Sequence, residues 1–263
     1  MISVKQVSKI YKVKQQVDTK NILKALLKCE YKQVKAVESI SFNIKQGEMV
    51  GLIGLNGAGK TTTLKMLSGL IYPSAGEIQV NGFTPCDLRK DFLRQIGLIM
   101  GNKSQLWWDV SSYDSFELEG QIYQLDKNII EKRVNQLSEL LDVKHLLKIP
   151  VRKLSLGERM KMEFILVLLH EPSLLFMDEP TIGLDIISQK KLRDFIKEYH
   201  RKHQSTILLT SHNMKDVEEL CERIIVINRG TIIYDGLICE LKEYSKEDDF
   251  ETTITKLLER REL

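Results

Sequence analysis

Short apolar runs alternate with amphipathic stretches along most of the chain. The run "EMVGLIG" has the pattern of a buried strand, and "KTTTLKMLSGL" after it has the pattern of a helix that ends at a glycine. The segments "SLLFMD" and "STILLTS" are two more runs of strand length, each followed by a helix-like segment. Because strands alternate with helices, the pattern predicts an α/β fold with a largely parallel sheet.

Antiparallel strands and a helical insertion modify this plan. The segment "RIIVINRGTIIYDG" has the pattern of a hairpin with its turn at Asn228-Arg229-Gly230. Between about residues 102 and 170 the pattern is mostly helical, which predicts a helical subdomain inserted between strands of the core. We therefore expect one domain over residues 1–240 and a helical tail over residues 241–263.

Composition narrows the class of protein only slightly. The chain has 263 residues, 43% of them hydrophobic, which is enough for a sizeable core. A formal net charge of +3 over the whole chain is too small to indicate a nucleic-acid partner, and we expect none. No apolar run approaches the roughly 18–20 residues of a membrane span, and we expect no secretory signal. The four cysteines show no metal-ligand or disulfide spacing, so we expect reduced thiols in a cytosolic protein.

A glycine-rich loop follows the first buried strand. The stretch "GLNGAGKTT", Gly54 to Thr62, matches the phosphate-binding pattern G-x-x-x-x-G-K-[ST] between a predicted strand and a predicted helix. Backbone N–H groups of such a loop converge on phosphate oxygens at the positive end of the helix. We expect Lys60 to neutralise the β- and γ-phosphates and the Thr61 hydroxyl to hold Mg²⁺. The other loop residues predicted to contact a nucleotide are Asn56, Gly57, Ala58, Gly59 and Thr62.

Two adjacent carboxylates end a later strand, in "LLFMDEP". Four apolar residues carry the chain through the core, so Asp178 and Glu179 lie at the carboxyl end of the strand, where open α/β sheets bind ligands. One carboxylate can bind Mg²⁺, and the next can accept a proton from an attacking water. We expect Asp178 to be the metal ligand and Glu179 to be the catalytic base.

A third motif, "LSLGERM", shortly precedes these carboxylates. The chain shows neither an acceptor-substrate site typical of a kinase nor the N-K-x-D stretch of a GTPase. With all three motifs, it resembles the nucleotide-binding subunits of ATP-binding cassette (ABC) transporters, over about residues 1–236 and in the family's order. The resemblance implies that Ser155, Gly157 and Glu158 open a helix that binds the γ-phosphate of a nucleotide held by a second subunit. It therefore implies a head-to-tail dimer, homomeric or heteromeric, that closes on ATP.

Further positions match other motifs of this family. The resemblance implies that Tyr11 stacks on adenine, that Asp185 in "TIGLD" lies in the loop crossing the dimer interface, and that His212 in "LLTSHNM" is a catalytic contact to the γ-phosphate. One motif departs from the pattern, because the glutamine that usually follows a strand such as "RQIGLIM" is absent. Asn102 stands at the best-matching position and Gln105 follows three residues later. We favour Asn102 as the metal-linked coupling residue, and Gln105 stays open.

The combination of "GNKSQLWWDV", "LSLGERMKMEF" and "LLFMDEPTIGLD" looks most like the type-2 export branch of the family. In such transporters, the region that here reads "QLWWDV" receives a short helix from the membrane subunit, and at least one of Trp107 and Trp108 is predicted to be exposed there. We therefore expect an ATPase on the cytoplasmic face of the cell membrane, powering export through separate integral membrane permease subunits. Two alternatives are a non-transport ABC ATPase of the translation or DNA-repair type and a cassette that only binds ATP.

A basic segment at about residues 14–35 is the last local feature. Between Lys9 and Lys35, eight lysines stand against two acids. The stretch "KNILKALLKCEYK" spaces four lysines at helical i, i+4 intervals, opposite a set of apolar residues. Two interpretations stay open: a solvated helix packed on the domain, or a basic amphipathic helix that contacts anionic lipid or the membrane partner. The lysines of this stripe are Lys20, Lys24, Lys28 and Lys32.

Overall fold

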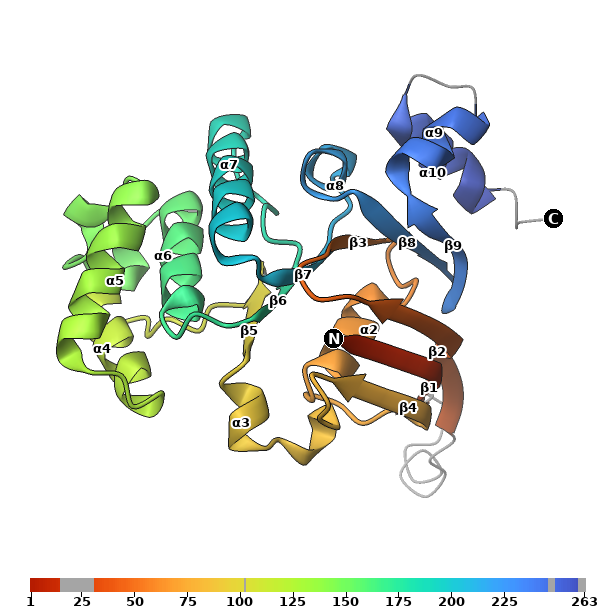
Figure 1. The fold of residues 1–263 in the computed structure, drawn as a ribbon, viewed down its shortest axis with the longest axis horizontal. Helices are drawn as coiled ribbons and strands as arrows, with labels where there is room; N and C mark the ends of the chain where they lie inside the picture. The colour runs from red at the N-terminus through yellow and green to blue at the C-terminus, as the bar shows by residue number, and fades with distance from the viewer. Residues whose placement is uncertain (15–30, 102, 246–248, 260–263) are drawn as a thin grey trace, which may run out of the picture.

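The computed structural model describes residues 1–14, 31–101, 103–245 and 249–259 (Figure 1). A six-stranded sheet runs through the middle of the molecule in the order β5-β6-β7-β3-β8-β9. All neighbouring strands are parallel except β8 and β9, which form the predicted hairpin. The mostly parallel α/β sheet predicted from the sequence is confirmed. The strands are β3 (Met49–Ile53), β5 (Ile96–Met100), β6 (Leu174–Asp178), β7 (Thr206–Thr210), β8 (Arg223–Asn228) and β9 (Thr231–Leu237).

A smaller antiparallel sheet lies at the lower right of Figure 1, in the order β2-β1-β4. Its strands are β1 (Ile2–Lys14), β2 (Tyr31–Ile44) and β4 (Ala75–Val80). Buried side chains of this sheet pack with those of helix α2 (Lys60–Leu67) and of the large sheet in one apolar cluster. The helix α2 is therefore fixed between two sheets, which holds its N-terminus in place.

Helices occupy the predicted insertion. These are α4 (Ser112–Ile122), α5 (Lys127–Leu140) and α6 (Leu156–Leu168), on the left of Figure 1. A second apolar cluster joins them to the large sheet and to α7 (Ile186–His203). The other helices in the described part of the chain are α3 (Lys90–Leu93), α8 (Met214–Leu220), α9 (Ile238–Ser245) and α10 (Phe250–Glu259), with short 3₁₀ turns η1 (Pro85–Asp87), η2 (Lys144–Leu146) and η3 (Val151–Lys153).

The basic segment differs from its prediction at the end that the structure describes. Lys32 lies in β2 opposite Val13, and the ladder with β1 continues to the pair Lys14 and Tyr31. The predicted helix is therefore wrong at Lys32. Pairing with β1 satisfies the backbone hydrogen bonds of this stretch, and the helical spacing of the lysines supplies no comparable stabilisation. Lys20, Lys24 and Lys28 lie outside the described residues. Within the described ranges, no helix is both long and apolar enough to cross a bilayer.

Candidate functional site

The glycine-rich loop leaves β3, whose five residues are all buried, and enters α2. Gly59 precedes the helix with φ 113°, a left-handed conformation that favours glycine. A Cβ at Gly59 would lie 2.5 Å from the carbonyl oxygen of Ala36, so the loop also passes too close to β2 for any side chain. Gly57, at φ 79°, instead faces open space. The loop is therefore packed against β2 at one glycine and open at the other.

This geometry predicts the effect of adding a methyl group to the loop. Gly59→Ala should lower the free energy of unfolding and weaken ATP binding, because strain at positive φ adds to a clash with the Ala36 carbonyl. Gly82→Ala is the matched control, since Gly82 has φ 79° with no atom near its Cβ position. The control should lose only about 1 kcal/mol from backbone strain. Chemical denaturation and nucleotide titration measure both effects, and equal stability losses in the two variants would contradict the clash.

Lys60 is the first residue of α2, and its side chain is buried beneath the loop. Its Nζ donates hydrogen bonds to the carbonyl oxygens of Gly54 at 2.7 Å and Leu55 at 3.2 Å. Burial lowers the pKa of Lys60, while the nearby charges of Glu179 and Asp178 act in the opposite direction. The ammonium group is therefore held at the loop, with carboxylates close enough to influence it.

Asp178, at the end of β6, is bonded to two threonine hydroxyls. Thr61 Oγ1 donates to the carboxylate, 3.0 Å from each oxygen, and Thr210 Oγ1 of β7 donates to Oδ1 at 2.6 Å. Asp178 is 5% exposed. The hydroxyl and the carboxylate proposed for the metal thus lie side by side, although the two residues are 117 positions apart in the chain.

Glu179 and His212 contact each other at the same edge of the sheet. The Nδ1 atom of His212 lies 2.8 Å from Glu179 Oε1, and the backbone N–H of His212 donates to Oε2 at 3.2 Å. The backbone of Glu179 has φ 54°, which is uncommon for a residue with a side chain. Its N–H donates to the carbonyl of Thr210 at 3.0 Å, so β7 holds this conformation.

One pocket of about 310 Å³ joins the loop, Glu179 and His212. It opens at the carboxyl ends of parallel strands, the edge at which α/β sheets bind ligands. Its lining leaves out several positions for which the resemblance implied a role, among them Tyr11, Ser155, Gly157 and Asp185. The lining residues are Ala36, Asn56, Gly57, Gly59, Lys60, Thr61, Thr62, Glu179, Ile182 and His212.

Ser155 and Glu158 form a capping box at the start of α6. Ser155 Oγ accepts from the N–H of Glu158 at 3.3 Å, and Glu158 Oε2 accepts from the N–H of Ser155 at 2.8 Å. The Ser155 N–H and the Ser155 hydroxyl, which donates to the same oxygen at 2.8 Å, hold the pKa of Glu158 below its usual range. The spacing S-x-x-E is a recognised start signal of helices, so this structural role could have been predicted from the sequence. The Ser155 side chain is nevertheless exposed.

The other residues that the resemblance implied have different places in the fold. Asp185 caps α7, where its Oδ1 accepts from the N–H groups of Ile187 and Ser188, each at 3.0 Å. Tyr11 lies half-buried in β1. Asn102 lies outside the described residues. The Gln105 side chain donates to the Leu98 carbonyl at 2.7 Å.

The pattern of loop, carboxylates and sheet defines a P-loop nucleoside triphosphatase. Comparison with known proteins identifies the family within this class, because residues 37–182 match the model described as "ABC transporter". The chain belongs to the ABC transporter family and is an ATP-binding, ATP-hydrolysing subunit of it, as the resemblance implied. Non-transport functions are not favoured by these comparisons.

Two relatives and one solved structure illustrate the match. The ABC transporter ATP-binding protein NatA of Bacillus subtilis (strain 168) is 37% identical over 218 residues, 83% of this chain and 88% of NatA. The bacitracin transport ATP-binding protein BcrA of Bacillus licheniformis is 32% identical over 217 residues, 82% of this chain and 70% of BcrA. A dimeric ATP-binding cassette in a post-hydrolysis state, bound to ADP and Pi, superposes with a TM-score of 0.75 at 22% identity, covering 90% of this chain and 98% of that chain.

Sequence reasoning missed residues whose roles depend on contacts between distant segments. Thr210 carries no motif signal, yet it binds Asp178 directly. Asp216 and Arg193 form a buried ion pair behind the site. The sequence offered one signal for a role of Thr210, namely a polar residue at the end of the apolar stretch "STILLTS". This signal could not identify Asp178 as the residue that Thr210 contacts.

Proposed function

We propose that this chain is the ATPase of an exporter, working as half of a head-to-tail pair that drives separate membrane subunits. The observation that carries the proposal is that Lys60, Thr61, Glu179 and His212 line one pocket. Lys60 neutralises the β- and γ-phosphates, Glu179 accepts a proton from the attacking water, and His212 contacts the γ-phosphate.

The donor set at Thr61 and Asp178 fits Mg²⁺. A hydroxyl and a carboxylate oxygen 3.0 Å apart are hard oxygen ligands, and phosphate and water oxygens complete such sites in nucleotide-binding proteins. Among the described residues, no three His, Cys, Asp or Glu side chains form a group that could hold a metal ion. The ion would neutralise phosphate charge there. Asn102 is a further proposed contact.

The head-to-tail pairing is supported by the predicted nucleotide contacts that do not line the chain's own pocket. Ser155, Gly157 and Asp185 lie at or near the N-termini of α6 and α7, outside the lining of the chain's own pocket. Ser155 and Asp185 are exposed and can contact a second subunit. The N-terminus of α6 also offers the partial positive charge that suits a phosphate. The solved cassette described above is a dimer, which supports pairing of this chain as well.

An exposed pair of tryptophans supports a membrane partner on the cytoplasmic face. Trp107 and Trp108 are 61% and 51% exposed. The sequence predicted that at least one of them would be exposed, and both are. The Arg159 guanidinium lies over the Trp108 ring at 5.0 Å, which orients this ring at the surface. Exposed aromatic patches commonly mark protein partners. The name of BcrA, a bacitracin transport protein, supports transport as the purpose.

This docking surface can be tested by removing the two rings. Trp107→Ala combined with Trp108→Ala should weaken co-purification with the integral membrane subunit at least about tenfold, because buried aromatic anchors dominate interfaces. Tyr72→Ala is the control, since Tyr72 is an aromatic residue outside this stretch that is even more exposed (68%). Pull-down from membranes, with ATP hydrolysis by the isolated chain measured alongside, gives the readout. Equal capture by the double variant and the control would exclude the tryptophans from docking.

A further inference from the structure

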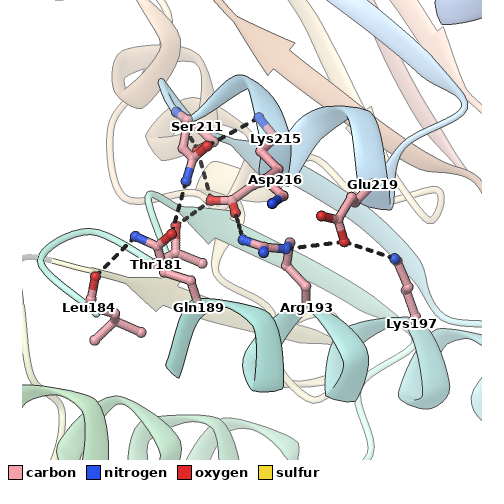
Figure 2. Close-up of polar contacts among 10 residues, drawn as sticks. Thr181, Leu184, Gln189, Arg193, Lys197, Ser211, Lys215, Asp216 and Glu219 are labelled. Atoms are coloured by element: carbon pink, nitrogen blue, oxygen red, sulfur yellow. Dashed lines mark hydrogen bonds and ion pairs between the residues drawn. The ribbon is translucent and has the colours of Figure 1, made fainter. Parts of the chain in front are cut away.

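A buried carboxylate, Asp216, joins the two loops that carry the proposed catalytic side chains (Figure 2). Asp216 lies in α8 and is fully buried. Its Oδ2 accepts hydrogen bonds from the hydroxyl of Thr181 and, at 3.3 Å, from that of Ser211. Thr181 is two residues after Glu179, and Ser211 directly precedes His212. One carboxylate therefore binds both loops from behind the pocket.

Arg193 of α7 fixes the other oxygen of this carboxylate. Its Nη1 donates to Asp216 Oδ1 at 2.7 Å, and the arginine side chain is 2% exposed. The Nε atom lies 3.3 Å from Oε2 of Glu219, an ion pair without hydrogen-bond geometry, and Lys197 donates to the same oxygen at 3.2 Å. Desolvation offsets much of the attraction in a buried pair. The clearer effect of Arg193 is that it orients the carboxylate toward the two loops.

A second connection runs beside the first (Figure 2). Gln189 of α7 donates from Nε2 to the carbonyl of Leu184 at 3.0 Å and accepts at Oε1 from Nδ2 of Asn213 at 3.3 Å. The backbone N–H of Asn213 donates to Ser211 Oγ at 3.0 Å. The loop that follows Glu179 and the loop that carries His212 are thus linked through Asp216 and through Gln189, in addition to the direct contact of Glu179 with His212.

These contacts hold a geometry that the backbone does not favour by itself. Glu179 has a left-handed φ of 54°, and such residues persist where surrounding contacts determine them. The carboxylate of Glu179 meets the ring and the N–H of His212 only if the two loops keep their spacing. Loops are ordinarily the more mobile parts of a fold. The Thr181 and Ser211 hydroxyls on Asp216 reduce that freedom.

We propose that Asp216 is a positioning residue for ATP hydrolysis. By accepting from Thr181 and Ser211 while Arg193 holds it, Asp216 fixes the carboxylate of Glu179 against His212. It does not line the pocket and acts only through these two loops. The proposal rests on the roles proposed above for Glu179 and His212.

The sharpest test removes one hydroxyl and leaves the buried charges paired. In the full chain, Thr181→Val keeps the side-chain shape and the Asp216–Arg193 pair, whereas replacing Asp216 would remove the buried partner of Arg193 and leave it only the ion pair with Glu219. At saturating ATP with Mg²⁺, kcat should fall at least about tenfold, because small misplacements of reacting groups are costly. KM for ATP should change little. Thr181→Ser should restore kcat, since it restores the hydroxyl.

Thr206→Val is the matched control for loss of a buried threonine hydroxyl. Thr206 is fully buried at the start of β7, the opposite end from Thr210, and its Oγ1 accepts from the N–H of Gly47 at 2.9 Å. This variant should lower Tm and leave kcat unchanged. Ser211→Ala removes the second hydroxyl from Asp216 and should lower kcat in the same direction, which keeps the proposal testable if Thr181→Val does not fold.

The outcomes separate this proposal from the function on which it rests. Wild-type kcat in Thr181→Val, no restoration by Thr181→Ser, or an equal loss of kcat in Thr206→Val would each overturn the positioning role. Glu179→Gln is measured in the same assay. If Glu179→Gln is inactive while Thr181→Val is normal, only the positioning role fails. If Glu179→Gln turns over normally, the proposed catalytic assignment itself fails.

Discussion

Glu179→Gln should keep ATP binding and lose most turnover. The amide has the shape of the carboxylate but cannot take a proton from the attacking water, and loss of a positioned base typically costs about 10²–10⁴-fold in rate. One oxygen remains to accept the backbone N–H of His212, so the local fold should survive. Since ATP then binds without being hydrolysed, the closed dimer should persist with ATP and Mg²⁺. Phosphate release and gel filtration with ATP measure the two effects.

Glu171→Gln is a closely matched control for this change. Glu171 also has a positive φ, of 53°, and its carboxylate forms an ion pair with Arg133 outside the pocket. The control should hydrolyse ATP at the wild-type rate. Wild-type turnover in Glu179→Gln would remove this residue from the role of base. A lost ability to bind ATP would show instead that the carboxylate is structural.

Two inactive chains should complement each other when they pair. Lys60→Ala removes the phosphate-binding ammonium, and Ser155→Arg places a bulky cation where the second subunit's nucleotide is expected. In a head-to-tail pair of these variants, one composite site carries both lesions and the other carries none. ATP hydrolysis should therefore return in pairs isolated through two different affinity tags, although each variant alone is inactive.

The control places the same two lesions differently. A chain carrying both Lys60→Ala and Ser155→Arg, paired with a wild-type chain, has one lesion in each composite site and should stay inactive. Ser155 also caps α6, so its loss should cost about 1 kcal/mol of stability, which thermal melting will show. Equal activity in the two kinds of pair would contradict the composite site. A chain with Gly57→Cys and Gly157→Cys gives a second test. A cross-link between these two positions that forms only within one chain would also contradict the composite site.

Local signals explain most of what could be predicted about the fold. Buried strands such as β3 and β6 are short apolar runs, and α2 begins where the glycine loop ends, so their positions follow from nearby residues. The hairpin of β8 and β9 turns at Arg229 and Gly230, both with positive φ, close to the predicted turn. The basic segment shows the limit of this reasoning, because strand pairing with β1 decided the state of Lys32.

The candidate site divides in the same way. The identities of Lys60, Thr61, Asp178 and Glu179 as candidates came from short motifs, since a phosphate loop and a strand-end carboxylate are local patterns. Their roles remain predictions until the variants above are measured. The contact of Thr61 with Asp178 could be expected from the shared sheet edge, but its length and its sharing with Thr210 could not.

The sequence by itself determined the mostly parallel α/β plan, the family and the candidate residues of the phosphate loop, because each depends on spacing over a few residues or on motifs in order. The tertiary structure decided which distant side chains meet. The pair Arg193 and Asp216 joins two helices, and Asp216 in turn binds the loops beside Glu179 and His212. Hydrogen bonds and ion pairs act within a few ångströms in space, whatever the separation along the chain. Only the packing of α7 and α8 behind the strand ends brings these groups within that range.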